Sequence, residues 1–238
     1  MSKNKFKRVF LALDTNQLAS TIKLVEQLKN DLGGIKIGKE LFSYFGPEII
    51  KKFKKFNLPI FLDLKFHDIP TTVYRAVKAI NIIKPNYLSI HSMGGNKMIN
   101  AAVEASKYTK ILSVSLLSHH EQKNLKEIGI KDSIKNQIKR LISNALKNNV
   151  HGLILAPKDL TILKNFLKKK VEIFVPGIRP NKSKKDEHKR SLDPLTAIKE
   201  GATYIIIGRP LLRSKNPKKK LQLINQEIKK YLEKNNGA

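Results

Sequence analysis

The chain has 238 residues, and 41% of them are hydrophobic. A chain of this length and composition can bury a large core, which excludes an intrinsically disordered protein. It contains no cysteine, so disulfides, thiolate metal ligands and a cysteine nucleophile are excluded.

The formal net charge is +28, a value that raises the question of a nucleic-acid partner. The 47 basic residues are 40 lysines and seven arginines. Nucleic-acid sites usually add arginine forks and stacking aromatic side chains, but aromatic residues make up 7% of this chain and tryptophan is absent. We therefore expect solvated lysine-rich helix faces and no nucleic-acid partner. The basic field would still attract an anionic substrate.

No segment approaches the roughly 18 consecutive apolar residues of a membrane span. Residues 1–5 lead into a short apolar run and lack the longer apolar stretch of a signal peptide. No linker rich in proline, glycine or serine divides the chain. We therefore expect one domain over residues 1–238, no membrane partner and a cytoplasmic protein.

A short apolar run followed by an amphipathic helical pattern recurs along the chain. The apolar runs predict strands at residues 9–13, 35–37, 60–62, 87–90, 111–114, 152–155, 171–175 and 204–207. The helical patterns predict helices at residues 18–32, 43–56, 70–84, 97–108, 133–148, 159–167, 194–200 and 216–231. A longer insertion precedes the helix at 133–148, and residues 179–192 form a polar, charged segment.

About eight such units is the number found in a closed parallel barrel. The strands are nearly continuous apolar runs, as expected when helices cover one face and the barrel interior covers the other. A doubly wound open sheet is the main alternative, and it requires a reversal of strand order that the sequence does not display. We predict an α/β fold, a single (β/α)8 TIM barrel.

In such a barrel the active site lies at the carboxyl ends of the strands. Polar residues follow several of the predicted strands and would meet at one mouth. They are Asp14, Lys36, Asp63, Lys65, Ser118, Arg179 and Arg209.

The third strand leads into a cluster of charged residues. Asp63 and Lys65 are two residues apart, so in extended geometry they point to the same side. Lys36 from the adjacent strand can complete an alternating array with them and with Asp68. Burying these charges is costly unless they pair. Taken alone, the cluster is equally compatible with catalysis and with an ion-pair network that only stabilises the mouth.

A second candidate site follows the last strand, where the backbone amide of Gly208 and the guanidinium of Arg209 suit a phosphate group. TIM barrels often bind phosphate at the loops after strands seven and eight. Arg179, after the seventh strand, adds a second cation. The charged loop after Arg179 could close over a bound phosphate. The alternatives are a barrel-closing turn with a solvated arginine after strand eight, and a disordered linker loop after strand seven.

The histidines do not predict a metal site. His119, His120 and His151 lack metal-ligand spacing, and His91 could either line the site or cap the barrel. No P-loop, GxGxxG or HExxH pattern is present. Nothing in the sequence demands a metal or an organic cofactor.

An ordered set of motifs resembles those of the bacterial orotidine 5'-phosphate decarboxylases. They are ALD at 12–14, KIGKE at 36–40, FGP at 45–47, FLDLKFHDIP at 61–70, PGIRP at 176–180 and IGRP at 207–210. The set runs from the first predicted strand to the last. The resemblance implies cofactor-free decarboxylation of orotidine 5'-monophosphate to uridine 5'-monophosphate and CO2, in the de novo synthesis of pyrimidines.

The resemblance also implies roles for the charged cluster. Lys65 would protonate C6 of the pyrimidine as CO2 leaves, and Asp63 would lie against the substrate carboxylate. Lys36 would belong to the catalytic array. The enzyme would be a homodimer in which Asp68 reaches the partner's site.

Further residues match the substrate-binding positions of the family. The resemblance implies that Asp14 and Lys36 hold the ribose hydroxyls, that Thr72 is donated to the ribose region and that Ser118 hydrogen-bonds the pyrimidine.

Arg179, Gly208 and Arg209 would form the phosphate grip. One departure from the family pattern falls in the phosphate loop, where His188 stands in place of the usual glutamine. A histidine can still donate a hydrogen bond to phosphate.

Two alternative functions stay open. Sugar-phosphate decarboxylases and synthases on the same barrel share the Asp-x-Lys-x-x-Asp spacing but use magnesium. The continuation over residues 67–70 and the GIRP motif at 177–180 favour the orotidylate enzyme. A nucleic-acid-binding barrel without catalysis is the third hypothesis, and the charged cluster after the third strand argues against it.

Overall fold

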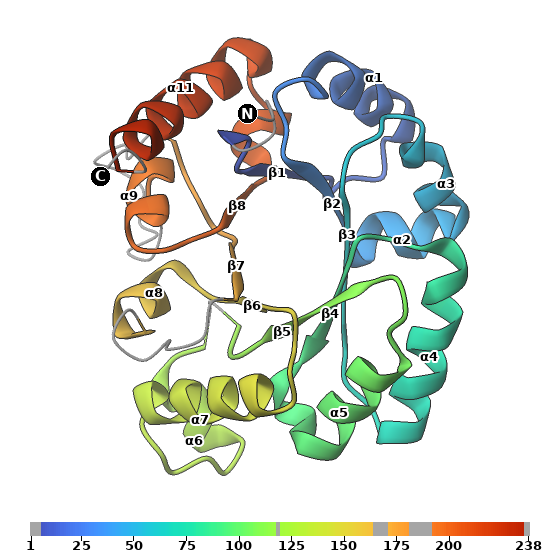
Figure 1. Ribbon diagram of the computed structural model, residues 1–238, viewed down its shortest axis with the longest axis vertical. Helices are drawn as coiled ribbons and strands as arrows, with labels where there is room; N and C mark the ends of the chain where they lie inside the picture. Colours follow the sequence, from blue (N-terminus) through green and yellow to red (C-terminus); the bar gives the residue numbers. More distant parts are fainter. Residues whose placement is uncertain (1–5, 118–119, 164–170, 181–191, 236–238) are drawn as a thin grey trace.

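The computed structural model describes residues 6–117, 120–163, 171–180 and 192–235. Within these residues, eight parallel strands form a closed barrel in sequential order, from β1 next to β2 round to β8 next to β1 (Figure 1). Helices surround the barrel. The predicted (β/α)8 fold is confirmed, and the alternative of an open, doubly wound sheet is excluded because the strand order never reverses.

The strands lie where the apolar runs predict them, within one or two residues at most ends. They are β1 (Val9–Ala12), β2 (Gly34–Gly38), β3 (Ile60–Phe66), β4 (Tyr87–His91), β5 (Lys110–Val114), β6 (Gly152–Ile154), β7 (Glu172–Val175) and β8 (Tyr204–Ile207). The exception is β3, which continues past the predicted end at Leu62 as far as Phe66.

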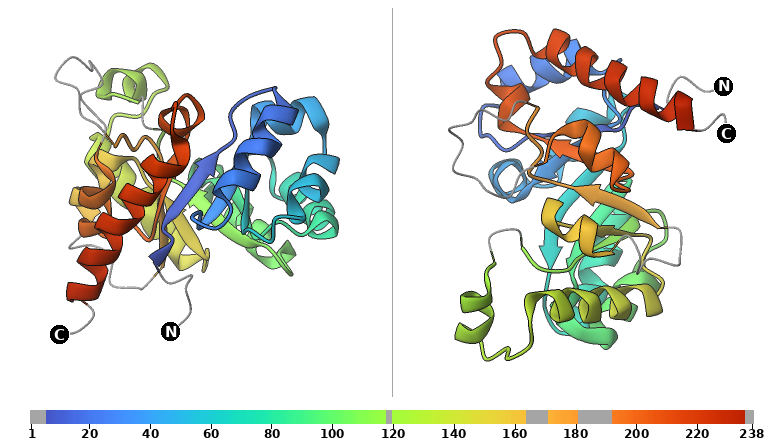
Figure 2. Two further views of the ribbon diagram at one scale, coloured as in Figure 1. Left: turned by 90° about the horizontal axis from the view of Figure 1, so that it is seen from above. Right: turned by 90° about the vertical axis from the view of Figure 1, so that its left-hand side faces the viewer.

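The helices depart further from the prediction. They are α1 (Leu18–Leu28), α2 (Lys39–Phe45), α3 (Glu48–Lys54), α4 (Pro70–Ile83), α5 (Gly95–Ala105), α6 (Gln122–Glu127), α7 (Ile134–Lys147), α8 (Pro157–Leu163), α9 (Pro194–Lys199), α10 (Arg209–Leu212) and α11 (Pro217–Asn235), with a 3-10 turn η2 (Ser92–Gly94). Figure 2 shows them from two sides, with α11 along the outer wall, where it contacts α1 and α9.

The prediction of one helix over residues 43–56 is wrong. Two helices occupy this part of the chain, because Gly46 has a φ of 59° and ends α2, and Pro47 precedes α3. Glycine adopts positive φ at little cost, so it ends a helix where other residues would continue it. Two short helices, α6 and α10, lie where no helix was predicted.

Side chains of both strand faces are buried, as the apolar runs indicated. One buried cluster fills the space between strands and helices, and a smaller one fills the barrel interior. Phe10 and Phe174 meet edge to face inside the barrel, with ring centroids 5.2 Å apart. Because side chains alternate along a strand, Asp63 follows Phe61 on the inner face of β3, nearer the carboxyl end. The apolar interior therefore forms the floor under a charged mouth.

None of the helices in the described ranges is both long enough and apolar enough to cross a membrane.

Candidate active site

The local backbone at the end of β3 differs from a regular strand. Leu62 pairs with Leu88 of β4, but the next pair joins Phe66 to Ile90, so β3 carries extra residues and forms a bulge. Within the bulge Lys65 has a φ of 54°, in the left-handed region that few residues other than glycine adopt. Asp63 and Lys65 do meet, as predicted. The reason differs from the predicted one, because the bulge brings the two side chains together, whereas the prediction relied on the alternation of an extended strand.

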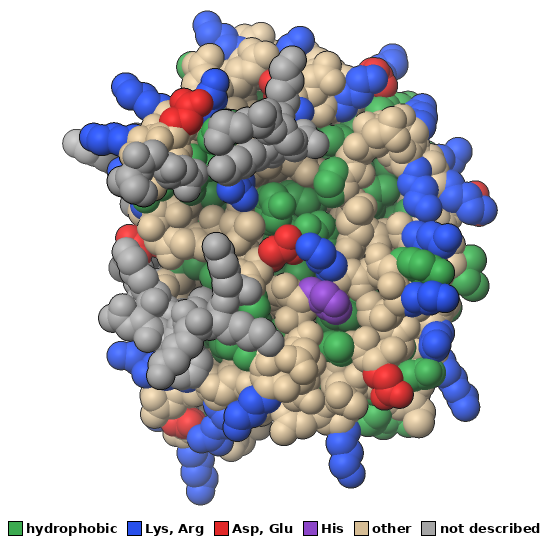
Figure 3. Space-filling view, in the orientation of Figure 1, with side chains coloured by type: hydrophobic (Ala, Val, Ile, Leu, Met, Phe, Trp, Pro, Cys, Tyr) green, Lys and Arg blue, Asp and Glu red, His purple; other side chains and the backbone are tan. Residues whose placement is uncertain are grey.

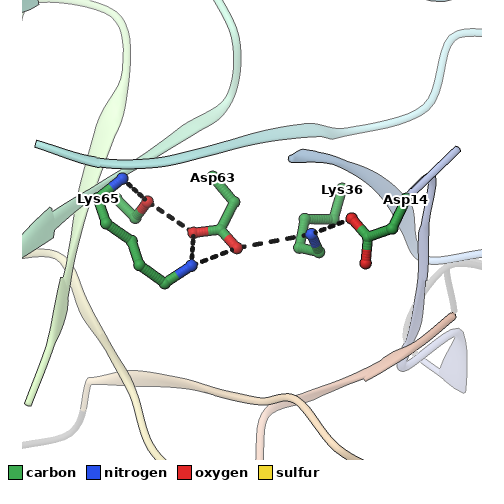
Figure 4. Close-up of polar contacts among 5 residues, drawn as sticks. Asp14, Lys36, Asp63 and Lys65 are labelled. Carbon is green, nitrogen blue, oxygen red and sulfur yellow. Dashed lines mark hydrogen bonds and ion pairs between the residues drawn. The ribbon is translucent and has the colours of Figure 1, made fainter. Parts of the chain in front are cut away.

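Four charged side chains form a row across the mouth (Figure 4). The Nζ atom of Lys65 lies 2.8 and 2.9 Å from the two carboxylate oxygens of Asp63. On the other side, Nζ of Lys36 lies 3.6 Å from Oδ2 of Asp63 and 2.9 Å from Oδ1 of Asp14. Strands β3 and β2 and the end of β1 supply the row, so three adjacent strands hold alternating charges. We call Asp14, Lys36, Asp63 and Lys65 the charged row.

Burial is uneven along the charged row. The exposed fractions of the side chains are 9% for Lys36, 12% for Asp63, 24% for Lys65 and 52% for Asp14. Burial by itself would raise the pKa of the Asp63 carboxyl, but the charges of Lys36 and Lys65 and two hydrogen bonds hold that pKa below its usual value. Asp63 is therefore an ionised carboxylate with little of its side chain exposed to solvent.

Ser89 is a site residue that the sequence analysis missed. It is fully buried in the middle of β4, where its hydroxyl donates to Oδ1 of Asp63 at 2.8 Å. The Ser89 hydroxyl oxygen in turn accepts the backbone N–H of Lys65 at 2.8 Å. A serine inside the apolar run of residues 87–90 was the available signal, because a buried hydroxyl needs a partner. Ser89 fixes both the carboxylate and the bulge.

Ser89→Ala is expected to lower the free energy of unfolding by about 2 kcal/mol, because it removes a hydrogen bond to a buried charge and leaves the Lys65 N–H unpaired. For a chain of this size the thermal midpoint should fall by about 4 to 8 °C, measured by calorimetry. Ser115→Ala is the matched control, since the Ser115 hydroxyl is buried and has no hydrogen-bond partner among the described residues. Equal midpoints for the two variants would contradict the role of Ser89.

Gly38 at the end of β2 was also missed. A Cβ atom added there would stand 2.7 Å from Oδ1 of Asp14 and 3.0 Å from Nζ of Lys36. No larger residue fits without moving the ion pair between these two side chains. The glycine of the KIGKE motif is therefore explained by the space that the charged row needs.

In the ranges that the structure describes, neither Asp68 nor Thr72 forms a hydrogen bond or ion pair with the charged row. Asp68 is exposed on the turn between β3 and α4, and its Oδ1 accepts the backbone N–H of Ile69 at 2.6 Å. Thr72 is exposed in the first turn of α4. The expected array ended at Asp68; within one chain, the fourth member of the row is instead Asp14.

The phosphate residues lie after adjacent strands. Arg179 follows β7 and is partly buried, and the exposed Arg209 begins α10 directly after β8. Gly208 borders the charged row, because a Cβ atom there would stand 3.9 Å from Oδ2 of Asp14. That they bind one phosphate together stays a prediction. Ser118 and His188, the remaining predicted contacts, lie outside the described residues.

The face seen in Figure 3 carries acidic, basic and histidine side chains together near its centre, over the ring of strands, with lysines and arginines around the edge. His91 is buried at the end of β4 and its ring stacks on that of His67, so it lines the mouth. His151 instead accepts the N–H of Ile111 at its Nδ1. Among the described residues, no three histidine or acidic side chains lie close enough to hold a metal ion.

A parallel barrel with a carboxylate–lysine row at the carboxyl ends of its strands defines a class of TIM-barrel enzyme. The sequence model of the Orotidine 5'-phosphate decarboxylase / HUMPS family matches residues 7–224, which is most of the chain. The chain belongs to this family, as the motifs indicated.

Individual relatives agree. The orotidine 5'-phosphate decarboxylase of Nitrosomonas eutropha is 35% identical over 223 residues, 93% of this chain and 96% of that protein. The protein of the same name from Wolbachia pipientis is 36% identical over 222 residues, 92% of this chain and 98% of its own length. The crystal structure of orotidine 5'-phosphate decarboxylase from Lactobacillus acidophilus superposes with a TM-score of 0.81 at 28% identity, covering 93% of this chain and 99% of that one.

Proposed function

We propose that this chain converts orotidine 5'-monophosphate to uridine 5'-monophosphate and CO2, a step of pyrimidine biosynthesis, with Lys65 as the proton donor. The observation that carries the proposal is the position of the Lys65 ammonium group, 2.8 Å from a buried, ionised Asp63 at the mouth of the barrel. Family membership and the curated relatives support the same reaction.

The chemical difficulty is a carbanion at C6 of the pyrimidine. When the bond between C6 and the carboxylate breaks, CO2 leaves and the electron pair stays on C6. The chain has to stabilise that charge with fixed dipoles and charges in a site that excludes water. Lys65 supplies a cation beside the developing charge and then transfers one Nζ proton to C6. The neutral amine that remains regains its proton from solvent.

Asp63 has two parts in this mechanism. It holds the Lys65 ammonium group in place through both of its oxygens. It also places a negative charge against the substrate carboxylate, and this repulsion disappears when CO2 departs. Interactions that are better in the transition state than in the ground state raise kcat.

The rest of the nucleotide is bound away from the reacting carbon. We assign the ribose hydroxyls to Asp14 and Lys36, at the more open end of the charged row, and the phosphate to Arg179, Gly208 and Arg209. Binding energy from these remote groups positions C6 over Lys65.

Three further roles stay predictions: the binding of ribose by Thr72, of the pyrimidine by Ser118 and of phosphate by His188. A cytoplasmic location is also a prediction.

The test is an assay for loss of the ultraviolet absorbance of orotidine 5'-monophosphate, with the purified chain in EDTA and again with added magnesium. We expect equal turnover under both conditions. Turnover of this nucleotide that needs magnesium would contradict cofactor-free catalysis. No turnover under either condition would refute the proposed function, and turnover of a sugar phosphate instead would assign the chain to the magnesium-dependent relatives.

The proposal includes a homodimer in which Asp68 completes the partner's site. Asp68 is exposed and has no hydrogen bond or ion pair to the charged row of its own chain among the described residues, and Ile69 beside it exposes 63% of its surface. An apolar side chain next to an exposed carboxylate suits burial against a second copy. Tyr44, 64% exposed, is a second large apolar residue available for contact.

Mixing subunits tests the shared site. Lys65→Ala and Asp68→Asn are each expected to be nearly inactive alone. After unfolding and refolding together in equal amounts, they should regain about a quarter of the wild-type activity, since half of the dimers are mixed and each mixed dimer has one intact site. Activity that never exceeds the sum of the two separate variants would place Asp68 in its own subunit's site.

A further inference from the structure

His91 is the last residue of β4, two residues beyond Ser89 and on the same inner face of the barrel. It is 9% exposed. Its ring stacks on the ring of His67, with centroids 5.4 Å apart and planes 21° from parallel. His67 is exposed and directly precedes Asp68, so this contact joins the buried end of β4 to the turn that carries Asp68.

One hydrogen bond defines the proton position on the His91 ring. Nδ1 accepts the backbone N–H of Met93 at 3.3 Å. A neutral imidazole that accepts at Nδ1 carries its proton on Nε2, whereas the protonated ring has a proton on both nitrogens and cannot accept. The first turn after β4 therefore requires a neutral His91.

The electrostatic surroundings favour the same state. Burial is the largest cause that lowers the pKa of His91 to about 4, and the cationic side chains of Lys65 and Lys39 and the neighbouring imidazoles of His67 and His120 contribute in the same direction. At neutral pH the His91 ring is therefore uncharged, so it can stack on the His67 ring without placing a cation beside Lys65 and Lys39.

We propose that His91 is a positioning residue, whose neutral ring holds His67 and thereby orients the Asp68 carboxylate toward the partner's active site. The inference rests on the proposed function, which places Asp68 in that site. Within the described part of the chain, the contacts of the His91 ring are to Met93 and His67 and not to the charged row, so its effect passes through the turn of residues 67–69.

A double-mutant cycle tests the route. His91→Asn keeps an acceptor near the position of Nδ1 but removes the ring, and we expect kcat to fall by about 10- to 100-fold, the usual cost of a misplaced catalytic group. In an Asp68→Ala background the same change should lower kcat almost no further, because the carboxylate that His91 is proposed to orient is already absent. Equal losses in both backgrounds would overturn the proposal, and so would wild-type turnover by His91→Asn.

His67 gives a second test at an exposed position, where folding is not at risk. His67→Ser should reproduce the loss seen for His91→Asn and should be silent in the Asp68→Ala background, while His67→Phe, which keeps a flat ring, should recover most of the activity. Equal turnover for the serine and phenylalanine variants would show that stacking has no role. His151→Asn is the matched control, because His151 also accepts a backbone N–H at Nδ1 but lies at the amino-terminal end of the strands.

Nitrogen NMR of the imidazole rings provides a readout independent of activity. Wild-type His91 should be the Nε2–H tautomer at pH 7, and a doubly protonated ring or an Nδ1–H tautomer would refute the proposal. Inactive wild-type protein would refute the proposed function and leave this tautomer result standing. Active wild-type protein with additive losses would instead refute the role of His91 alone.

Discussion

Lys65→Ala is expected to lower kcat by at least about 10⁴-fold, because one side chain supplies both the proton and the cation beside the developing charge. Uridine 5'-monophosphate should still bind within a few-fold of the wild-type affinity, since ribose and phosphate are held by other residues. Single-turnover kinetics would measure the first effect, and titration calorimetry with uridine 5'-monophosphate the second.

Lys52→Ala is the matched control for this change. Lys52 is exposed on α3, so its loss lowers the net charge by the same amount without touching the mouth. The control should keep wild-type kcat. If Lys65→Ala also stays within a few-fold of wild type, Lys65 is not the proton donor, and the charged row is an ion-pair network that stabilises the fold.

Asp63→Asn has the second-largest expected effect, and it acts on catalysis and stability together. The change leaves Lys36 and Lys65 facing each other with no carboxylate between them. Removing one partner of a buried charge group typically costs about 3 to 5 kcal/mol of folding stability. We expect kcat to fall by about 10³-fold, because Lys65 loses the group that positions it.

The lowered pKa of the Asp63 carboxyl allows a prediction of how the free energy of unfolding depends on pH. The pKa of Asp63 is lower in the folded chain than its usual value of 3.8. Asp63 therefore stabilises the fold fully above that usual value, and the contribution is lost as the pH falls through the lower, folded pKa. Unfolding by urea at pH 7 and at decreasing acidic pH should show this loss in wild type and not in Asp63→Asn.

Asp132→Asn is the control for both measurements. Asp132 also pairs with a cation, Arg140, and accepts a backbone N–H, but it does so near the surface, far along the chain from the row. Exposed ion pairs contribute little, about 0 to 1 kcal/mol. If Asp63→Asn is no more costly than this control, Asp63 does not neutralise the two lysines.

Much of the fold could be predicted because each strand is an apolar run between two turns. Such a run can be recognised in the sequence without knowing how its side chains pack. Once the strands were located, the charged residues that follow them could be placed at one mouth, because the carboxyl ends of parallel strands meet there. The break at Gly46 was missed because the amphipathic pattern continues through it, from Leu41 to Phe53, although a glycine–proline pair was visible.

The remaining errors concern contacts between strands. The bulge at Lys65 depends on how β3 pairs with β4, and pairing register is not written in either strand alone. Ser89 and Gly38 act through neighbours distant in the sequence, one by a hydrogen bond and the other by leaving space. A periodic pattern records which face a residue is on, but not which atom it meets there.

At Lys65, the requirements of stability and of catalysis differ. The positive φ of this residue favours glycine, whereas the reaction needs the lysine side chain. A left-handed backbone costs a residue with a side chain about 1 kcal/mol or more, a cost that glycine does not bear. Lys65→Gly would relax that backbone while Asp63 keeps Lys36 and Ser89, and it would abolish proton transfer. A library selected for solubility or heat resistance alone should thus accept glycine at position 65, whereas a library selected for growth that depends on the enzyme should not. The two selections would retain different residues at position 65. The residue found there would therefore indicate whether a population of variants was selected for stability or for activity.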